Sequence, residues 1–177
     1  MSKEVISTTN GNIWLNFWDT SGKEITNKIL STQIYKSADC FIILCSYDSL
    51  SSLNSLTTWL DYLKKYTDQN GITTIPIFIV FNKYDKKKQF TANDIKKKLN
   101  ELMTSYESDN LFVCEGVSVK ENLNLNFLFE KVISQLSGDK LKSDSSFYNY
   151  SERYRLEVGK SFKLESKCSG CRNVSCC

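Results

Sequence analysis

The stretch "IPIFIVFNKYD" (residues 75–85) is a continuous apolar run that ends in four polar residues. Short apolar runs of this kind are typical of strands that are buried on both faces of a parallel sheet. The pattern predicts a central strand at residues 75–81, with the quartet Asn82, Lys83, Tyr84 and Asp85 directly after its carboxyl end. A polar quartet held there needs an explanation in terms of what it binds.

Strands and helices are expected to alternate along the rest of the chain. Further strands are predicted at residues 13–18, 40–47 and 111–118. Apolar residues recur at the spacing of amphipathic helices in residues 53–63, 95–106 and 125–136. Thr91 followed by Asp94 predicts a capping box at the start of the second helix. This alternation predicts an α/β domain with a largely parallel sheet.

Polar clusters follow three of the predicted strands. They are "DTSG" at residues 19–22, "NKYD" at residues 82–85 and "SVK" at residues 118–120. Taken singly, these are explained equally well as a turn, a solvated loop and the start of a helix. Ligands of such sheets bind at the carboxyl ends of the strands, so clusters on successive strand ends favour one ligand site on this rim.

Composition excludes several kinds of chemistry. The chain has no histidine, which excludes histidine-based acid/base catalysis, Ser-His nucleophiles and histidine metal ligands. Cys40, Cys45 and Cys114 lie in apolar strands and are expected to be core residues in a reducing compartment. Neither a membrane-spanning apolar run nor the apolar core of a signal peptide is found, so a cytosolic location is expected.

Residues 137–177 differ from the rest of the chain. Helical periodicity stops there, and Ser, Lys, Asp and Gly dominate, which predicts a flexible tail. The tail holds eight Lys/Arg against five Asp/Glu and so carries the whole net charge of +3. This modest basic excess favours contact with an anionic surface near the C-terminus and not a nucleic-acid-binding domain.

The motifs together resemble those of the Ras superfamily of small GTPases and, within it, the Rab family. "WDTSG" is similar to the W-D-T-A-G of the family, "FNKYD" to its N-K-x-D and "VSVKEN" to its S-A-K element, and the ending "SCC" matches a common double-cysteine ending. The resemblance implies a Ras-like G domain that binds GTP and GDP as a switch in vesicle traffic. The GTP-binding residues it implies are Asp19, Thr20, Ser21, Gly22, Lys23, Asn82, Lys83, Tyr84, Asp85, Ser118, Val119 and Lys120.

The resemblance also implies how the base is read. Asp85 accepts hydrogen bonds from N1 and the exocyclic amine of guanine, a bidentate contact that adenine cannot supply. Asn82 binds the base edge and ties its loop to neighbouring segments, while the alkyl stem of Lys83 covers the base plane. The serine and lysine of "SVK" position the backbone amide of Val119 towards the guanine oxygen.

The sequence departs from the family in the phosphate-binding half of the site. The loop G-x-x-x-x-G-K-S/T and the Mg²⁺-binding threonine of switch I are not found, so residues 1–136 are interpreted as an N-terminally truncated small-GTPase domain. Asp19 would hold Mg²⁺ through water, but the ion's other ligands are lacking, and no metal site is assigned. Lys23 occupies the position of the water-orienting glutamine. Lysine has no acceptor group, so hydrolysis by the usual route is not expected and GTPase activity stays open.

The truncation removes a strand that the family places between the strand ending at Asp19 and the strand containing Phe41. Two unpaired hydrophobic edges would result, which is a costly arrangement. Three alternatives remain: the flanking strands close the gap, another chain fills it, or the sequence is an incomplete copy of a longer one.

The tail cysteines favour lipid attachment over zinc. Cys168, Cys171, Cys176 and Cys177 lie too close together for two typical pairs of zinc ligands. The ending is not a C-a-a-X prenylation motif. The Rab resemblance implies geranylgeranyl groups on Cys176 and Cys177, and therefore a hypervariable, lipid-anchored tail at residues 137–177.

Two functions are predicted from different classes. The first is a Rab-like switch on the cytoplasmic face of a membrane, with a cytosolic pool. Its implied partners are effectors, a prenylation escort protein and a GDP-dissociation inhibitor, with no nucleic acid. The second is a pseudo-GTPase, a membrane-tethered binding module without a nucleotide cycle.

Overall fold

The described part of the chain contains two separate sheets. The computed structural model describes residues 2–20, 38–68, 75–105 and 110–138. A parallel sheet has the strand order β3 (Phe41–Ser46), β4 (Ile77–Asn82) and β5 (Leu111–Cys114). A second, two-stranded sheet is the antiparallel hairpin β1 (Ser2–Thr8) and β2 (Gly11–Phe17). The predicted α/β class with a parallel sheet is confirmed.

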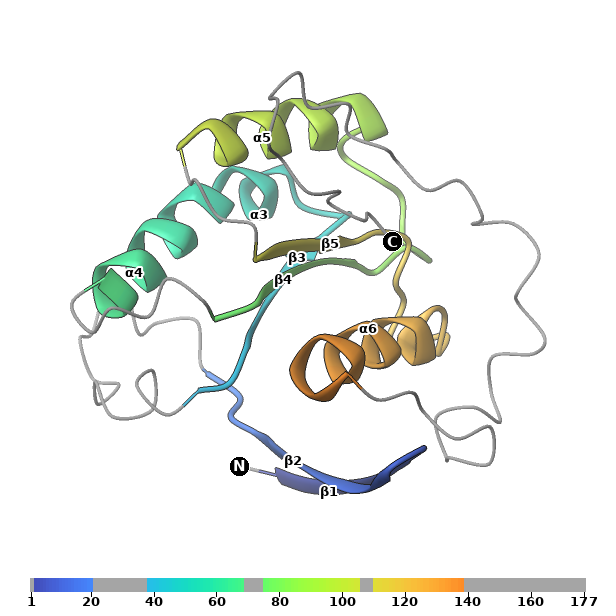
Figure 1. Ribbon diagram of the computed structural model, residues 1–177. Coiled ribbons are helices and arrows are strands. Elements are labelled where there is room, and N and C mark those ends of the chain that lie inside the picture. Colours follow the sequence, from blue (N-terminus) through green and yellow to red (C-terminus); the bar gives the residue numbers. More distant parts are fainter. Residues whose placement is uncertain (1, 21–37, 69–74, 106–109, 139–177) are drawn as a thin grey trace, which may run out of the picture.

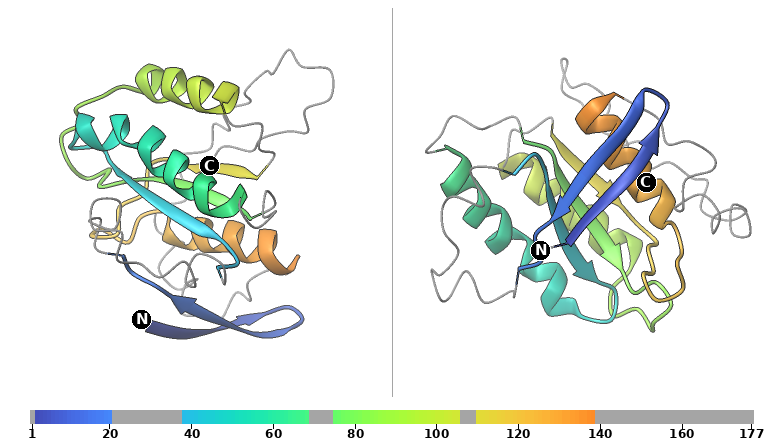
Figure 2. Two further views of the ribbon diagram at one scale, coloured as in Figure 1. Left: turned by 90° about the vertical axis from the view of Figure 1, so that its left-hand side faces the viewer. Right: turned by 90° about the horizontal axis from the view of Figure 1, so that it is seen from below.

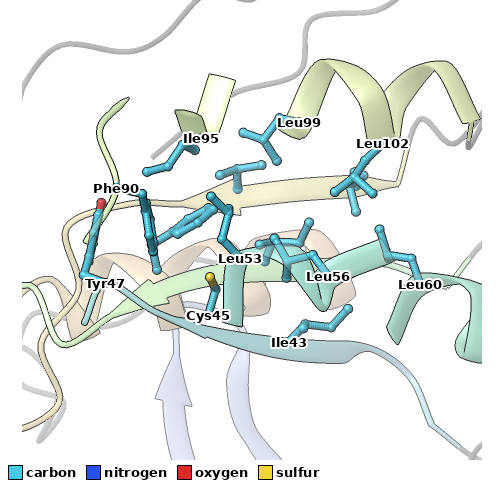
Figure 3. Packing of buried hydrophobic residues seen from close by; sticks show 14 of the residues in the cluster. Ile43, Cys45, Tyr47, Leu53, Leu56, Leu60, Phe90, Ile95, Leu99 and Leu102 are labelled. Atoms are coloured by element: carbon cyan, nitrogen blue, oxygen red, sulfur yellow. The ribbon is translucent and has the colours of Figure 1, made fainter. Parts of the chain in front are cut away.

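Helices cover both faces of the parallel sheet (Figure 1). α3 (Leu50–Asn54), α4 (Leu56–Asp68) and α5 (Ala92–Ser105) lie on one face, and α6 (Leu125–Ser137) lies on the other. The first layer packs leucines of α3 and α4 and apolar residues of α5 against one face of all three strands of the parallel sheet, and Figure 3 shows part of this cluster. Because β4 lies between the two layers, Phe78, Ile79, Val80 and Phe81 are all fully buried, which explains its continuous apolar run.

The hairpin packs on α6 and not on the parallel sheet (Figure 2). Ile6 of β1 and Ile133 of α6 form a small buried cluster, which Ile13 and Leu15 of β2 border. The ring of Phe17 contacts that of Phe129 edge to face at 5.9 Å. α6 therefore lies between the hairpin and the parallel sheet and has buried residues on two sides.

The gap predicted between β2 and β3 is not closed within the described part of the chain. There β2 pairs with β1, and β3 pairs with β4. The first of the three alternatives, closure by the flanking strands, is therefore contradicted by the structure. Leu44, in the middle of β3, is 60% exposed because this strand forms the edge of the described sheet.

Several predicted boundaries need correction. Strand β1 was not predicted, and the strand expected at residues 111–118 ends at Cys114, because Gly116 turns the chain with a left-handed φ of 69°. The helix expected at residues 53–63 is two helices, with Ser55 between them donating its hydroxyl to the carbonyl of Ser52 (2.9 Å). Cys45 and Cys114 are buried as predicted, whereas Cys40 is only partly buried.

The predicted capping box at the start of α5 is confirmed. The backbone N–H of Thr91 donates to Oδ2 of Asp94 (2.7 Å), and the N–H of Asp94 donates to the hydroxyl oxygen of Thr91 (3.3 Å). Two backbone donors at the start of the helix are thereby satisfied.

Replacing Ile133 by alanine is expected to loosen the hairpin more than the parallel sheet, because Ile133 packs on Ile6. Truncating a buried isoleucine to alanine costs about 2–5 kcal/mol. Amide hydrogen exchange in β1 and β2 should therefore accelerate by more than about tenfold. The control is Val132→Ala, because this neighbouring residue packs on the parallel sheet and should instead accelerate exchange in β4 and β5. Equal acceleration in both sheets by Ile133→Ala would contradict this arrangement.

Candidate functional site

The candidate site is at the carboxyl ends of β3 and β4, which reach the same level. Ser46, the last residue of β3, pairs with Asn82, the last residue of β4. The backbone turns out of the sheet at Lys83, whose φ is 61°. Two backbone hydrogen bonds, from Val117 N to Phe81 O (3.1 Å) and from Tyr84 N to Val117 O (3.0 Å), place residues 116–118 beside this turn. The second and third predicted motifs are thereby brought together.

Asn82 connects the two motifs through its side chain. Its carboxamide oxygen Oδ1 accepts a hydrogen bond from the N–H of Lys83 (2.7 Å) and a second from the N–H of Val119 (3.1 Å). One acceptor therefore fixes both the start of the 82–85 turn and the backbone of the "SVK" motif. The Val119 amide that was predicted to face a guanine oxygen is engaged with Asn82 in this structure.

Asp85 and Ser118 form a second connection. The hydroxyl of Ser118 donates to Oδ1 of Asp85 (2.6 Å) and accepts from the N–H of Glu121 (3.2 Å). The Ser118 hydrogen bond, with smaller contributions from the charges of Lys120 and Lys86, lowers the pKa of Asp85. Asp85 is therefore an ionised acceptor at neutral pH, suited to recognition and poorly suited to moving a proton.

Lys83 is held by Asp48, a residue that the sequence analysis did not single out. Its ammonium Nζ lies 3.4 Å from each carboxylate oxygen of Asp48. Asp48 also accepts from the hydroxyl of Ser46 (2.5 Å), which is the largest cause lowering its pKa. The signal was present in the sequence, because Asp48 directly follows the strand predicted at residues 40–47, which ends at the same rim.

The structure places the predicted site residues in three groups. The residues of "NKYD" and "SVK" come together as described above. Asp19 and Thr20 are exposed and follow β2, which belongs to the other sheet. Ser21, Gly22 and Lys23 lie outside the described residues, as do the tail cysteines Cys168, Cys171, Cys176 and Cys177.

The assembled groups suit a planar ligand with hydrogen-bond donors on one edge. An ionised carboxylate can accept two parallel N–H bonds from such an edge, and charge-assisted bonds of this kind are among the stronger ones. The turn at residues 82–85 and residues 118–120 reach this point from neighbouring strands. An arrangement of this kind can distinguish ligands by their donor pattern.

The chain is similar in sequence to known proteins of the Ras family. Residues 1–138 match the Ras family. The chain is 31% identical over 137 residues to the Ypt/Rab-type GTPase ypt71 of Schizosaccharomyces pombe, covering 77% of this chain and 64% of that protein. It is 29% identical over 125 residues to mouse Ras-related protein Rab-9B, covering 70% and 58%. It is 30% identical over 147 residues to a probable Rab-related GTPase of Acanthamoeba polyphaga mimivirus, covering 81% and 62%.

Replacing Ser118 by alanine is expected to raise the pKa of Asp85, because the variant lacks the donor that most stabilises its ionised form. Carbon-detected NMR titration of the carboxyl groups measures this shift. A depressed carboxyl pKa contributes stability above the unfolded pKa that is lost as the pH falls through the folded pKa. The stability difference between wild type and variant should therefore shrink in acid.

Asp94 is the internal control for this titration. Its pKa is also lowered, but by the N–H and hydroxyl of Thr91, so it should titrate identically in both proteins. An Asp85 pKa that does not change in Ser118→Ala would show that the hydroxyl does not hold the carboxylate.

Proposed function

Because the chain belongs to the Rab-type small GTPases of the Ras family, we propose that residues 82–85 and 118–120 bind the guanine base of GTP or GDP. The observation that carries the proposal is the carboxylate of Asp85, ionised and held in place by Ser118 at the carboxyl end of the sheet. In this proposal the protein is a membrane-associated nucleotide switch in vesicle traffic.

Base selection follows from the donors and acceptors. Guanine presents N1–H and an exocyclic amine side by side, so both can donate to the two oxygens of Asp85. Adenine has an unprotonated ring nitrogen at the corresponding position. This nitrogen is itself an acceptor, so it would repel the carboxylate instead of donating a hydrogen bond to it. Asn82 holds the backbone of Val119 close to this edge, where its N–H can turn to the guanine oxygen.

The phosphate half of the site is a separate matter. The chain spans 58% to 64% of the length of the three relatives described above, so the activity of a whole relative is proposed here and not transferred. In this proposal Asp19, Thr20, Ser21, Gly22 and Lys23 belong to the phosphate half of the site, and no metal site is assigned to them.

Lys23 favours a second candidate function. With no acceptor for a water proton, it makes hydrolysis by the usual route unfavourable. The second candidate is therefore a pseudo-GTPase, which would use the same fold as a tethered binding module without a nucleotide cycle. Measured nucleotide binding without turnover would favour this candidate.

Membrane attachment is proposed to rest on the C-terminal cysteines. No helix in the described ranges is long and apolar enough to cross a bilayer. Geranylgeranyl thioethers on Cys176 and Cys177 would each bury a C20 chain at about 0.8 kcal/mol per CH₂, and the basic excess of the tail would add attraction to anionic lipids. The proposed partners are Rab effectors, a prenylation escort protein and a GDP-dissociation inhibitor.

Asp85→Asn is expected to change the base preference from guanine to xanthine. An amide can accept from N1–H and donate to the carbonyl oxygen that replaces the exocyclic amine in xanthine, whereas a carboxylate can only accept. Competition among guanosine, xanthosine and adenosine triphosphates, followed by equilibrium titration, measures the preference. The expected change in relative affinity is at least about tenfold.

Asp94→Asn provides the matched control, because this carboxylate caps α5 and should leave the base preference unchanged. If the wild-type chain bound guanine and adenine nucleotides equally well, base recognition by Asp85 would be wrong.

Replacing Cys176 and Cys177 together by serine is expected to move the protein from membranes to the cytosol, because both lipid attachment points are lost. The control is the double replacement of Cys168 and Cys171, which should leave membrane binding nearly unchanged. Cell fractionation and mass analysis of the C-terminal peptide measure the result. Membrane-bound protein with unmodified Cys176 and Cys177 would refute lipid attachment at these residues.

A further inference from the structure

Tyr47 is a buried residue that directly follows β3. Its backbone forms hydrogen bonds with both ends of the neighbouring loop, residues 82–89. Its backbone N–H donates to the carbonyl of Asn82 (3.0 Å), and its own carbonyl accepts from the N–H of Gln89 (2.8 Å). The segment between these two bonds contains the whole "NKYD" motif. The loop is therefore closed at its base by the single residue that follows the adjacent strand β3.

The side chain of Tyr47 extends to the other loop, residues 115–120. Its hydroxyl oxygen accepts from the buried N–H of Gly116 (3.3 Å). The carbonyl of Gly116 accepts from the side-chain amide of Asn124 (2.9 Å). The N–H and the carbonyl of Gly116 are therefore both bound by side chains from other segments. The carboxyl end of β3 is thus linked to both loops of the candidate site.

Lys88 lies over the rings of Tyr84 and Tyr47 on the solvent side. Its ammonium lies 3.5 Å from the ring centroid of Tyr84 and 5.3 Å from that of Tyr47. The rings of Tyr47 and Tyr84 contact each other edge to face at 5.5 Å. The ring of Phe90 stacks on that of Tyr47 from the core at 5.5 Å, and Figure 3 shows Phe90 and Tyr47 side by side. A cation over an aromatic face stabilises such an arrangement.

Glu115 extends the link between the loops. Burial raises the pKa of its carboxyl group, and the positive charge of Lys88 opposes this shift. Lys88 therefore interacts with the second loop through a charge as well as with the first loop through a ring.

We propose that Tyr47, Tyr84 and Lys88 form a clasp that couples loops 82–89 and 115–120, so that the two loops open and close together. Resting on the proposed function, the clasp presents Asp85 and the backbone of Val119 to the base as one preformed surface. Its members act as positioning residues, because they act on the base through these two groups.

The coupling is testable in the unliganded full chain by amide hydrogen exchange. Lys88→Met keeps the length of the side chain and removes its charge. It should accelerate exchange about two- to fivefold, the factor that corresponds to an exposed cation–π contact, at the amides of both Tyr84 and Gly116. In a Tyr47→Phe background, where the hydroxyl link is gone, Lys88→Met should affect Gly116 less than in the wild-type background, because only the charge interaction with Glu115 then joins Lys88 to this loop. Acceleration at Tyr84 alone in the wild-type background would overturn the proposal.

Two matched variants separate the clasp from a general effect of charge. Lys87→Met removes the neighbouring exposed lysine and should change neither amide, whereas Lys88→Arg should restore slow exchange because arginine also stacks on aromatic rings. The ε-methylene protons of Lys88 should resonate upfield because they lie near the Tyr84 ring, and Tyr84→Leu should abolish that shift. Unshifted resonances in the wild type would overturn the clasp.

Measurements of nucleotide binding distinguish failure of the clasp from failure of base recognition. Lys88→Met should weaken guanosine triphosphate binding about two- to fivefold while the preference for guanine over xanthine is kept. Unchanged affinity despite faster exchange would overturn the positioning role. If the wild-type protein binds no guanine nucleotide, the proposed function fails, and the exchange measurements still decide whether the loops are coupled.

Discussion

The parallel pairing of β4 with strands on both of its sides fixes where the residues of "NKYD" and "SVK" lie. β4 pairs with β3 from Phe41↔Ile77 to Ser46↔Asn82, and with β5 from Ile77↔Leu111 to Val80↔Cys114. Its side chains alternate between two buried layers, so a slip by one residue would exchange the layers and is strongly opposed. The same register sets the polar strand ends at one level. Core packing and site geometry are thus determined together.

The site is held mainly by hydrogen bonds within the protein. The carboxamide of Asn82 binds two backbone amides from different loops, and the hydroxyl of Ser118 holds the carboxylate of Asp85. Groups that are already ordered lose little conformational freedom when a ligand arrives, which favours affinity. The cost is that the N–H of Val119 has to leave a protein acceptor before it can serve a ligand.

The sequence was informative wherever one periodic pattern determined the structure. The apolar run of β4, the helical stripes of α5 and α6 and the capping pair Thr91 and Asp94 were all predicted, because each reflects local spacing. The pairing of Lys83 with Asp48 was not predicted, because it joins residues far apart in the chain. The packing of the hairpin on α6 was missed for the same reason, and the early end of β5 depended on the backbone angle of a single glycine.

The two-sided burial of α6 has a consequence for the order of events during protein synthesis. The ribosome makes the hairpin at residues 2–17 well before α6, which supplies its packing partner Ile133. An isolated two-stranded hairpin is marginally stable in water, so its apolar face stays unprotected until α6 has been translated. The hairpin therefore waits for its final packing until α6 has been made, and during that interval a chaperone that shields apolar strands would have most to bind.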